Sequence, residues 1–377
     1  MKPTDVLLLS VEAGAGHGEA AKAVAASLQR RGLTVQIDDM FAFGPPWVFA
    51  TVIGSYLQML RWLPSLYRWG YRRAKEPSSG AMSKKLMAAY LDQLLGTALR
   101  QRIHQLQPRA ILCTHPFPMG LLSRYRREGW LQGRLAGIVT DFTVHPFWVY
   151  PECDCYYVAA PALLPEAERL GVRPDKVAVT GIPINDRFSE AQQRLRWEHE
   201  QALHLPTAEH RLLLMGGSLG LGPLEAAVSQ LLKLSLPQLQ IIAVAGKDQQ
   251  LEKRLRAMKG ESPSLFVYGY TREIPALMAC ADLIVTKPGG LSSSEAMAMG
   301  VPQLLLPPLP GHEEDNRDFL ISHHTAIAVP IEELAEQITA LLVEPTVMAS
   351  MRKACLNLGR PDAAAIVAGD LAEMLDG

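Results

Sequence analysis

Short, nearly continuous runs of apolar residues alternate with longer helical stretches along most of the chain. The first run is Val6 to Ser10, and a glycine-rich turn and an alanine-rich stretch to about Arg31 follow it. Leu33 to Ile37 predicts a second strand. Later runs predict strands over residues 110–113, 136–139, 156–158 and 177–179. Apolar runs of this kind, separated by helices, are typical of parallel strands that are buried on both faces.

The same pattern starts again near Arg211 and predicts a second domain. Strands are expected over residues 212–215, 241–244, 265–268, 283–285 and 304–306. We therefore predict an α/β protein of two Rossmann-like, doubly wound domains facing a cleft, with ligands at the carboxyl ends of the strands. The predicted domains span residues 1–186 and 205–358. A C-terminal helix within residues 361–377 is expected to pack back on the first domain.

Charge is balanced over the whole chain but not between its halves. The 377 residues include 37 basic and 38 acidic side chains, which argues against a surface coated in positive charge for nucleic acid. Residues 1–185 hold 21 basic and 14 acidic side chains, whereas residues 186–377 hold 16 and 24. The basic first half favours an anionic surface or ligand on that side, and chance clustering is the alternative.

Cysteine usage and the first residues of the sequence predict a cytoplasmic location. Five scattered cysteines form neither a disulfide framework nor a zinc motif, and no secretory signal is recognisable at the start. Residues 40–60 carry no charge, but Gly44-Pro45-Pro46 interrupts any helix there. The remaining 14 residues, Trp47 to Leu60, are too few to cross a bilayer and suit an interface.

A segment from about residue 47 to 75 combines aromatic and basic residues. It contains Trp47, Trp62 and Trp69, with Arg68 and Arg72 among the basic residues between them. Aromatic side chains beside cations suit the headgroup region of an anionic membrane. The alternative is a helical hairpin that packs its aromatic residues on the first domain.

Glycine and serine residues follow two predicted strands of the second domain. Gly216, Gly217 and Ser218 open one strand-to-helix turn, where backbone N–H groups can approach an anion. Residues 287–295 form another such turn, and its serines can cap the helix or contact phosphate. Glu295 follows within one turn and can hold the hydroxyls of a ribose, or form a capping box with Ser292.

These stretches resemble the monogalactosyldiacylglycerol synthase and processive diacylglycerol glucosyltransferase family, a part of glycosyltransferase family 28. Five sequence stretches carry the resemblance: Gly14-Ala15-Gly16-His17, residues 140–148, residues 180–183, residues 287–296 and Pro310-Gly311-His312-Glu313 with Asn316. The resemblance implies a GT-B fold, with a UDP-sugar on the second domain and a lipid acceptor on the first. The lipid II-forming N-acetylglucosaminyltransferases are more distant relatives.

The resemblance also implies roles for individual residues. Donor-binding roles fall to Gly216, Gly217, Ser218, Tyr270, Gly289, Gly290, Ser292, Ser294, Glu295, His312, Glu313 and Asn316. Within this group Tyr270 would cover the uracil, and Glu313 and Asn316 would lie near the hexose. The family usually has glutamine where this chain has His312, which leaves the identity of the hexose open. His145 and Trp148 are expected on the acceptor side.

His17 is the candidate general base of an inverting transfer. Histidine titrates near working pH, and the N-terminal end of a helix favours its neutral form. The alternative is a histidine that only hydrogen-bonds a phosphate or a carbonyl. Asp141 is the rival base, or else a group that orients His17. His115 and His145 each precede proline and are expected to be structural or to line the acceptor site.

We therefore predict a peripheral enzyme on the cytoplasmic face of the membrane. It would transfer a hexose, glucose first and galactose second, from a UDP-sugar to the 3-hydroxyl of diacylglycerol, with repeated transfer left open. No cofactor, metal or nucleic acid is expected, because helix N-termini can stabilise the leaving diphosphate. The alternatives are an N-acetylglucosaminyltransferase acting on another lipid-linked acceptor, a non-catalytic sensor of nucleotide sugar, and a sugar-nucleotide epimerase.

Overall fold

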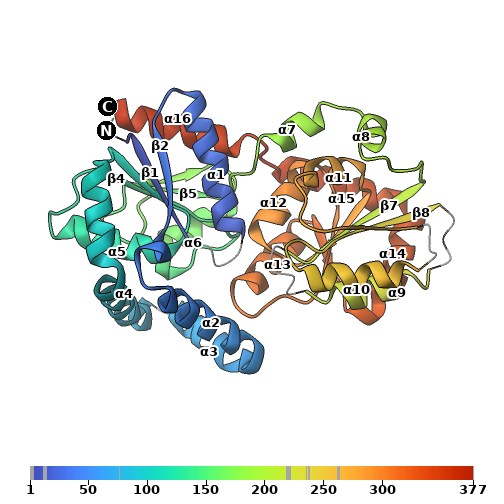
Figure 1. Cartoon of the computed structure of the whole chain (residues 1–377), viewed down its shortest axis with the longest axis horizontal. Helices are drawn as coiled ribbons and strands as arrows, with labels where there is room; N and C mark the ends of the chain where they lie inside the picture. The colour runs from blue at the N-terminus through green and yellow to red at the C-terminus, as the bar shows by residue number, and fades with distance from the viewer. Residues whose placement is uncertain are drawn as a thin grey trace. The chain divides into compact units, whose positions relative to one another are not determined.

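The chain folds into two units, each built on one parallel sheet (Figure 1). The computed structural model describes residues 4–11, 15–75, 77–217, 222–234, 236, 238–260 and 264–376. Unit 1 comprises residues 1–185, 309–312 and 362–377, and unit 2 comprises residues 186–308 and 313–361. The prediction of two doubly wound α/β domains is confirmed.

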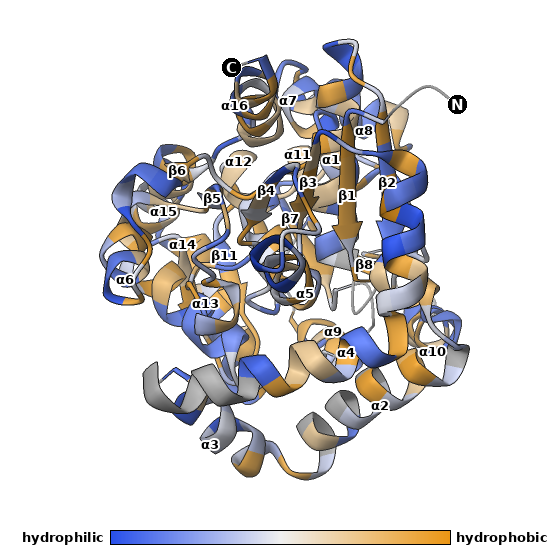
Figure 2. Ribbon diagram, turned by 90° about the vertical axis from the view of Figure 1, so that its left-hand side faces the viewer, coloured by the Kyte–Doolittle hydropathy of each residue, from blue (hydrophilic) through white to orange (hydrophobic). Residues whose placement is uncertain are grey.

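The sheet of unit 1 has six strands in the order β2-β1-β3-β4-β5-β6. Their bounds are β1 (Val6–Ser10), β2 (Val35–Asp39), β3 (Ala110–Cys113), β4 (Arg134–Ile138), β5 (Cys155–Val158) and β6 (Val177–Val179). Every residue of β1 and β3 is buried, as their unbroken apolar sequences require, and Figure 2 shows both strands in orange. The strands all run parallel, but the order in which they are added to the sheet reverses between β1 and β3, which is where such folds bind ligands.

Helices cover this first sheet and extend from one side of the unit. They are α1 (Ala15–Arg30), α2 (Pro46–Trp62), α3 (Pro64–Ala74), α4 (Pro77–Leu106), α5 (Pro116–Arg127), α6 (Leu164–Arg169) and α16 (Ala363–Asp376). Short 3₁₀ turns are η1 (Met40–Phe43), η2 (Pro146–Trp148), η3 (Pro161–Leu163) and η4 (Pro174–Lys176). The C-terminal α16 packs against α1, and its Val367 and Leu371 are fully buried in the core of unit 1.

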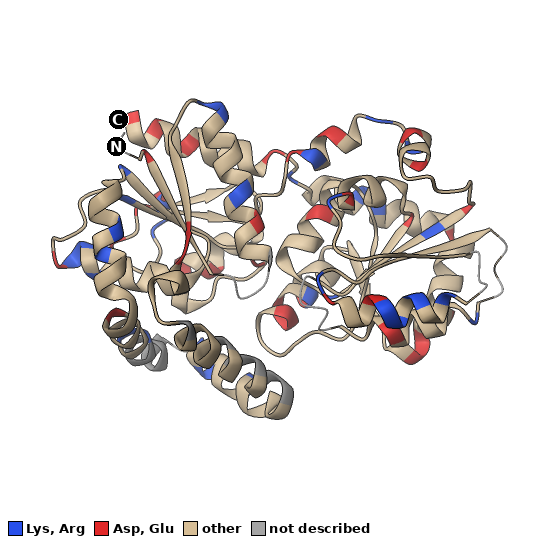
Figure 3. Ribbon diagram, viewed as in Figure 1, with Lys and Arg blue, Asp and Glu red and all other residues tan. Residues whose placement is uncertain are grey.

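The second sheet has six strands in the order β12-β11-β10-β7-β8-β9. Their bounds are β7 (His210–Met215), β8 (Leu239–Val244), β9 (Leu265–Tyr268), β10 (Leu283–Thr286), β11 (Gln303–Leu305) and β12 (Ala326–Ala328). In this sheet the reversal lies between β7 and β10. Figure 3 shows that the strands of both sheets are mostly uncharged and that charged residues gather on helices and loops.

Ten helical elements surround or follow this second sheet. They are α7 (Arg187–Gln192), α8 (Arg196–Ala202), α9 (Leu224–Leu231), α10 (Gln249–Lys259), α11 (Ile274–Cys280), α12 (Gly290–Ala298), α13 (His312–Ser322), η5 (Ile331–Glu333), α14 (Leu334–Val343) and α15 (Pro345–Leu358). The first residue of α13 groups with unit 1, and the rest of the helix groups with unit 2.

A buried ionic network fixes α8 to the second sheet. Arg211 of β7 is fully buried, and its guanidinium donates to the Glu200 carboxylate of α8 at 2.6 Å and to the Gln240 side chain at 2.9 Å. Arg196 of α8 pairs with both Glu200 and Asp282. A charge this deeply buried needs such partners. The network explains why residues 187–204, which the sequence left between the predicted domains, belong to unit 2.

Several strands begin one or two residues away from their predicted starts, and β12 was not predicted. β2 begins at Val35 and not at Leu33, because the Leu33 N–H still bonds the Leu28 carbonyl at the end of α1. Gly32, with a φ of 84°, makes the turn that this requires. β12 consists of Ala326, Ile327 and Ala328, and alanine is uncommon in strands, so the sequence pattern did not indicate a strand there.

Candidate active site

In unit 1, the predicted base His17 and two threonines lie at the carboxyl ends of β1, β3 and β4. His17 lies in the first turn of α1, which follows β1. Thr114 directly follows β3, and Thr140 follows β4. Because β1 pairs with β3 and β3 pairs with β4, these three chain segments meet at one edge of the sheet, beside the reversal. Gly14, at the start of the glycine-rich stretch, lies outside the described residues.

The hydrogen bonds of His17 define which of its ring nitrogens carries the proton. Nδ1 lies 2.6 Å from the Thr114 carbonyl oxygen and 2.9 Å from the Thr140 hydroxyl. A carbonyl oxygen can only accept, so we assign the proton to Nδ1. The Nε2 lone pair of the neutral ring then remains available. This is the tautomer that a general base requires.

The surroundings of His17 favour its neutral form. Burial lowers the pKa of His17 below its usual value, while the negative charge of Asp141 acts in the opposite direction. The side chain is half-buried, at the edge of the sheet. His17 is therefore unprotonated at neutral pH. Thr114 and Thr140 hold its Nδ1, and the structure gives Asp141 an electrostatic effect on the ring.

The loop after β4 is held by three separate elements of unit 1. Glu166 of α6 accepts the Val144 N–H at 2.7 Å, and Lys84 of α4 donates to the carbonyls of Pro146 and Val149 at 3.1 Å. From α3, the Tyr71 ring stacks on His145, with centroids 4.7 Å apart. His145 therefore links the loop to α3, which the sequence did not indicate.

The expectation that Trp148 belongs to an acceptor or membrane surface needs correction. Its side chain is only 3% exposed. A Cβ added to Gly137 of β4 would lie 3.3 Å from the Trp148 ring, so the ring packs against the bare backbone of that strand. Trp148 is therefore a core residue that packs between the loop and β4, and its side chain is too buried to contact a lipid headgroup.

In unit 2, glycine-containing turns lie at the carboxyl ends of β7 and β10. Gly216 and Gly217 follow β7, and Gly217 has a φ of 76°, which favours glycine over other residues. Ser218 lies outside the described residues. Gly289 is the N-cap of α12, and Gly290 is the first residue of that helix. Since β7 and β10 pair in parallel, the two turns are neighbours at the reversal of the sheet.

The serines of α12 differ in their accessibility. Ser293 is fully buried, Ser294 is 8% exposed, and Ser292 is half-buried. Ser292 is thus the most open of the three, while the structure gives Ser294 little surface for a ligand. Glu295 is also half-buried on the same helix. Together with the N-terminal N–H groups of α12, this arrangement can hold an anion with attached hydroxyl groups.

A buried ion pair supports the turn after β10. The Lys287 ammonium lies 3.1 Å from the Glu313 carboxylate, with side chains only 11% and 9% exposed. Asn316, which is fully buried, donates its amide to the Pro288 carbonyl at 3.1 Å. Glu313 and Asn316, both predicted to lie near a sugar, therefore have a structural role at this turn. Sequence analysis missed Lys287, although it opens the quoted motif.

Replacing Glu313 with alanine is expected to destabilise unit 2. The change leaves the Lys287 ammonium buried without this carboxylate, at a cost of about 2–4 kcal/mol. We expect the thermal midpoint of the unliganded protein to fall by roughly 5 to 10 °C.

The exposed pair of Glu225 and Arg254, 2.7 Å apart, supplies the control, and Glu225→Ala is expected to change the midpoint little. Adding Lys287→Met to Glu313→Ala is expected to restore part of the loss. Equal effects of Glu225→Ala and Glu313→Ala in differential scanning calorimetry would contradict this interpretation of the buried pair.

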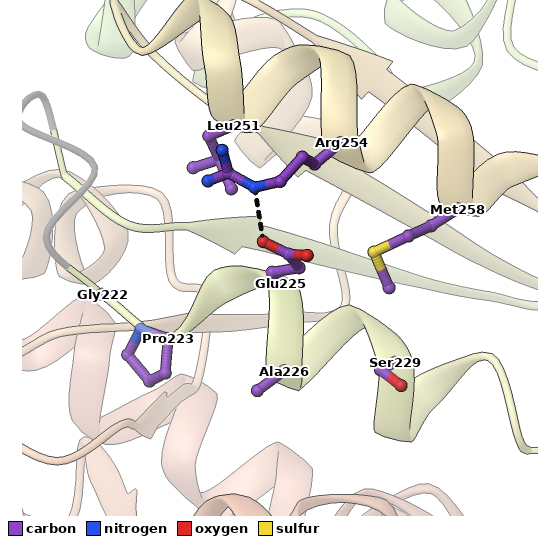
Figure 4. Close-up of a pocket in the computed structure, with 8 residues that line it drawn as sticks. All are labelled: Gly222, Pro223, Glu225, Ala226, Ser229, Leu251, Arg254 and Met258. Atoms are coloured by element: carbon purple, nitrogen blue, oxygen red, sulfur yellow. Dashed lines mark hydrogen bonds and ion pairs between the residues drawn. The ribbon is translucent and has the colours of Figure 1, made fainter.

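The Glu225–Arg254 pair crosses a pocket of about 580 Å³ between α9 and α10 (Figure 4). Apolar side chains of Ala226, Leu251 and Met258 line it together with the pair. No residue predicted for the site lines this pocket, so it lies apart from the predicted donor-binding groups.

Tyr270 is more exposed than the other donor-binding candidates of unit 2 that the structure describes. It follows β9, and its side chain is 63% exposed. The Lys247 ammonium lies 5.7 Å from the centre of its ring. An open aromatic face beside a cation can stack with a planar ring of a ligand. His312, the first residue of α13, is half-buried.

Helices α2 and α3 carry a largely exposed aromatic surface. They pack against each other and project from unit 1, away from its sheet (Figure 1). Trp47, Trp62 and Trp69 are 53%, 71% and 62% exposed. Arg72 is exposed and Arg68 half-buried on α3. These tryptophans are therefore not packed into the core of unit 1, which was the alternative.

No helix among the described residues is long and apolar enough to cross a membrane. Within the same part of the chain, no group of three or more His, Cys, Asp or Glu side chains is placed to hold a metal ion. That the reaction proceeds without a metal stays a prediction.

Family models match both units of the chain. Residues 17–184 match the model of monogalactosyldiacylglycerol (MGDG) synthase, and residues 211–366 match the C-terminal domain of glycosyltransferase family 28. The chain is similar to the processive diacylglycerol beta-glucosyltransferase of Bacillus subtilis, at 29% identity over 97% of this chain and 94% of that protein. The enzyme of the same name from Staphylococcus carnosus is 28% identical, over 94% and 88% of the two chains.

Solved structures share the fold at low sequence identity. The glycotransferase of kitacinnamycin has a TM-score of 0.66 at 15% identity and covers both chains completely. MurG of Acinetobacter baumannii has a TM-score of 0.60 at 16% identity, covering 99% of this chain and 100% of that one. A putative UDP-N-acetylglucosamine 2-epimerase of Listeria monocytogenes scores 0.65 at 14% identity, covering 100% and 98%. The shared fold is GT-B, and it includes both transferases and epimerases.

Proposed function

We infer that this chain belongs to the monogalactosyldiacylglycerol synthase and processive diacylglycerol glucosyltransferase family, and on that premise we propose that it transfers a hexose from a UDP-sugar to diacylglycerol. Sequence similarity over both units supports this acceptor. The single observation that carries the mechanism is the fixed tautomer of His17, whose Nδ1 is bound to the Thr114 carbonyl. A histidine held in this way has Nε2 ready to accept a proton.

We propose a single displacement at the anomeric carbon of the donor. The 3-hydroxyl oxygen of diacylglycerol attacks this carbon while His17 Nε2 takes the hydroxyl proton. The bond between the anomeric carbon and the diphosphate oxygen breaks, and UDP leaves with the bonding electrons. Attack from the face opposite UDP inverts the α-linkage of the donor to a β-linkage in the product.

We base the donor-binding roles on the N-terminus of α12 and on the side chains at the ends of the strands of unit 2. The N-terminus of α12, with Gly289 and Gly290, suits the diphosphate, because its free N–H groups and helix dipole favour negative charge. Ser292 adds a hydroxyl at the same place, and Tyr270 offers an open ring for the uracil. We assign the hexose to the half-buried His312, while the buried Glu313 and Asn316 support the neighbouring turn after β10. Glucose is the first choice and galactose the second, with repeated transfer as a further possibility.

Replacing Glu295 with alanine is expected to weaken UDP binding if its carboxylate holds the ribose hydroxyls. Two hydrogen bonds to a charged group correspond to a loss of affinity of about a hundredfold or more. Isothermal titration with UDP measures it. The capping-box alternative does not apply, because Gly289 and not Ser292 is the N-cap of α12. Glu295→Gln serves as the comparison, because it keeps the shape of the side chain and removes its charge. If Glu295→Ala binds UDP as the unchanged protein does, the carboxylate does not hold the ribose.

We further propose that α2 and α3 hold the enzyme on an anionic lipid surface. The three exposed tryptophans and Arg72 support this proposal. A lipid acceptor resides in a membrane, so an enzyme that acts on it gains by binding there. Peripheral association on the cytoplasmic face also agrees with the cysteine usage of the chain.

The proposed activity is tested by a product assay. The purified protein is mixed with diacylglycerol micelles and, separately, with UDP-glucose, UDP-galactose and UDP-N-acetylglucosamine, and the lipid extracts are read by mass. A hexosyl-diacylglycerol from one donor identifies the sugar. An N-acetylhexosaminyl lipid would favour the first alternative, whereas tight UDP binding without any glycolipid would favour the sensor.

A further inference from the structure

The sequence His-Pro-Phe occurs twice, at the ends of two neighbouring strands. His115 begins two residues after β3, and His145 lies in the loop after β4. In both cases the histidine Nδ1 accepts the backbone N–H of the phenylalanine two residues on, at 3.2 Å for Phe117 and 3.3 Å for Phe147. Each histidine thereby caps the following helical turn. Since Nδ1 accepts, the proton of each neutral ring is on Nε2.

The two histidines share this cap but contact different partners. The ring of His115 meets the ring of His17 edge to face, with centroids 4.7 Å apart and planes at 76°. The ring of His145 instead stacks on Tyr71 of α3. The first His-Pro-Phe turn therefore contacts the candidate base His17, and the second contacts helix α3.

The contact with His115 completes the surroundings of His17. Thr114 and Thr140 hold the Nδ1 edge, and His115 packs on the ring itself. Burial, together with the positive charge of His17 or His312, keeps the pKa of His115 well below its usual value, so it stays neutral when His17 gains a proton. The other groups acting on His17 are Asp141, which favours its charged form, and His312, which opposes it.

We propose that His115 is a positioning residue for the general base His17. Its neutral ring holds the imidazole against Thr114 and Thr140 and keeps water from one face of it. His17 thereby remains an unprotonated base at a lower pH than a hydrated histidine would. This inference rests on the proposed function of His17, and it assigns His115 no contact with either substrate.

Two substitutions separate the ring of His115 from its cap. His115→Asn keeps a side chain that can cap α5 but removes the ring and lets water reach His17. We expect the acid limb of the kcat–pH profile, measured with UDP-glucose and diacylglycerol micelles, to move to higher pH by roughly half a unit to one unit. His115→Phe keeps an apolar ring but loses the cap. We expect its acid limb to stay in place while the thermal midpoint falls by a few degrees.

His145→Asn is the matched control, because it makes the same change in the second His-Pro-Phe turn. Its acid limb is expected to coincide with that of the unchanged enzyme. An unshifted acid limb in His115→Asn would overturn the proposal, and so would an equal shift in His145→Asn. An equal shift in both variants would mean that the substitutions loosen the loops in general and that contact with His17 is not the cause.

A titration of the histidines by NMR measures the pKa of His17 directly, without turnover. The signal lost in His17→Ala identifies His17, and its pKa is then followed in His115→Asn, His115→Phe and His145→Asn. If the product assay fails but the His17 pKa rises only in His115→Asn, the positioning contact stands and the proposed reaction does not. If the reaction proceeds and the pKa is the same in all three variants, the inference about His115 is wrong.

Discussion

Replacing His17 with alanine is expected to lower kcat by about 100- to 10,000-fold, the usual contribution of a general base. The acceptor hydroxyl would lose the group that takes its proton, while the donor-binding residues of unit 2 would be untouched. UDP affinity is therefore expected to remain within about twofold of the original value, because His17 belongs to unit 1. Initial rates of lipid glycosylation and UDP titration measure the two quantities.

An exposed histidine of the same unit provides the control for this change. His104→Ala on α4 is expected to leave both the rate and the affinity unchanged, because its side chain lies on the surface. In the unchanged enzyme the rate should fall as the pH drops through the lowered pKa of His17, since protonation of Nε2 removes the base. Full activity in His17→Ala would transfer the role of base to Asp141.

Replacing both Trp62 and Trp69 with alanine is expected to abolish most membrane binding. These side chains are 71% and 62% exposed on adjoining helices, so they can enter a lipid interface without unfolding the protein. Burying one large apolar side chain contributes about 1.5–3 kcal/mol at most. Partial burial of two in the headgroup region therefore predicts a drop of about tenfold or more in binding. Flotation with liposomes that contain phosphatidylglycerol measures it.

Trp197 offers a matched control for that experiment. It is 59% exposed but lies on α8 of unit 2, apart from α2 and α3. Trp197→Ala is expected to leave flotation unchanged. Arg72 should make the binding sensitive to salt, because a cation near an anionic leaflet contributes about 1 kcal/mol. If the double variant floats as well as the unchanged protein, α2 and α3 are not the membrane surface.

The sheets were the most predictable part of the molecule. Strands such as Val6–Ser10 and Ala110–Cys113 are unbroken apolar runs, because parallel strands covered on both faces exclude polar residues. The glycine-containing sequences after β1, β7 and β10 mark strand ends that carry candidate site residues. β2 begins two residues later than predicted, because the Leu33 N–H bonds the Leu28 carbonyl at the end of α1. Only a three-dimensional contact of this kind decides such a boundary.

The candidate site was predictable in its location but not in its internal contacts. The position of His17 before a helix suggested a base, yet its tautomer depends on the Thr114 carbonyl, which is 97 residues away in sequence. Lys287 and Glu313 are likewise 26 residues apart, and neither sequence environment indicates the pairing. Trp148 was misplaced for the same reason, because an aromatic residue in a loop has no periodic pattern that shows whether it is buried.

The anomeric configuration of the lipid product tests the central claim most directly. The purified protein is incubated with UDP-glucose, whose sugar is α-linked, and with diacylglycerol, and the isolated glycolipid is examined by proton NMR. We predict a β-linked hexosyl-diacylglycerol that does not form when His17 is alanine, as a single displacement assisted by that residue requires. An α-linked product would contradict the mechanism, and the absence of any diacylglycerol glycoside from the three donors would contradict the proposed function.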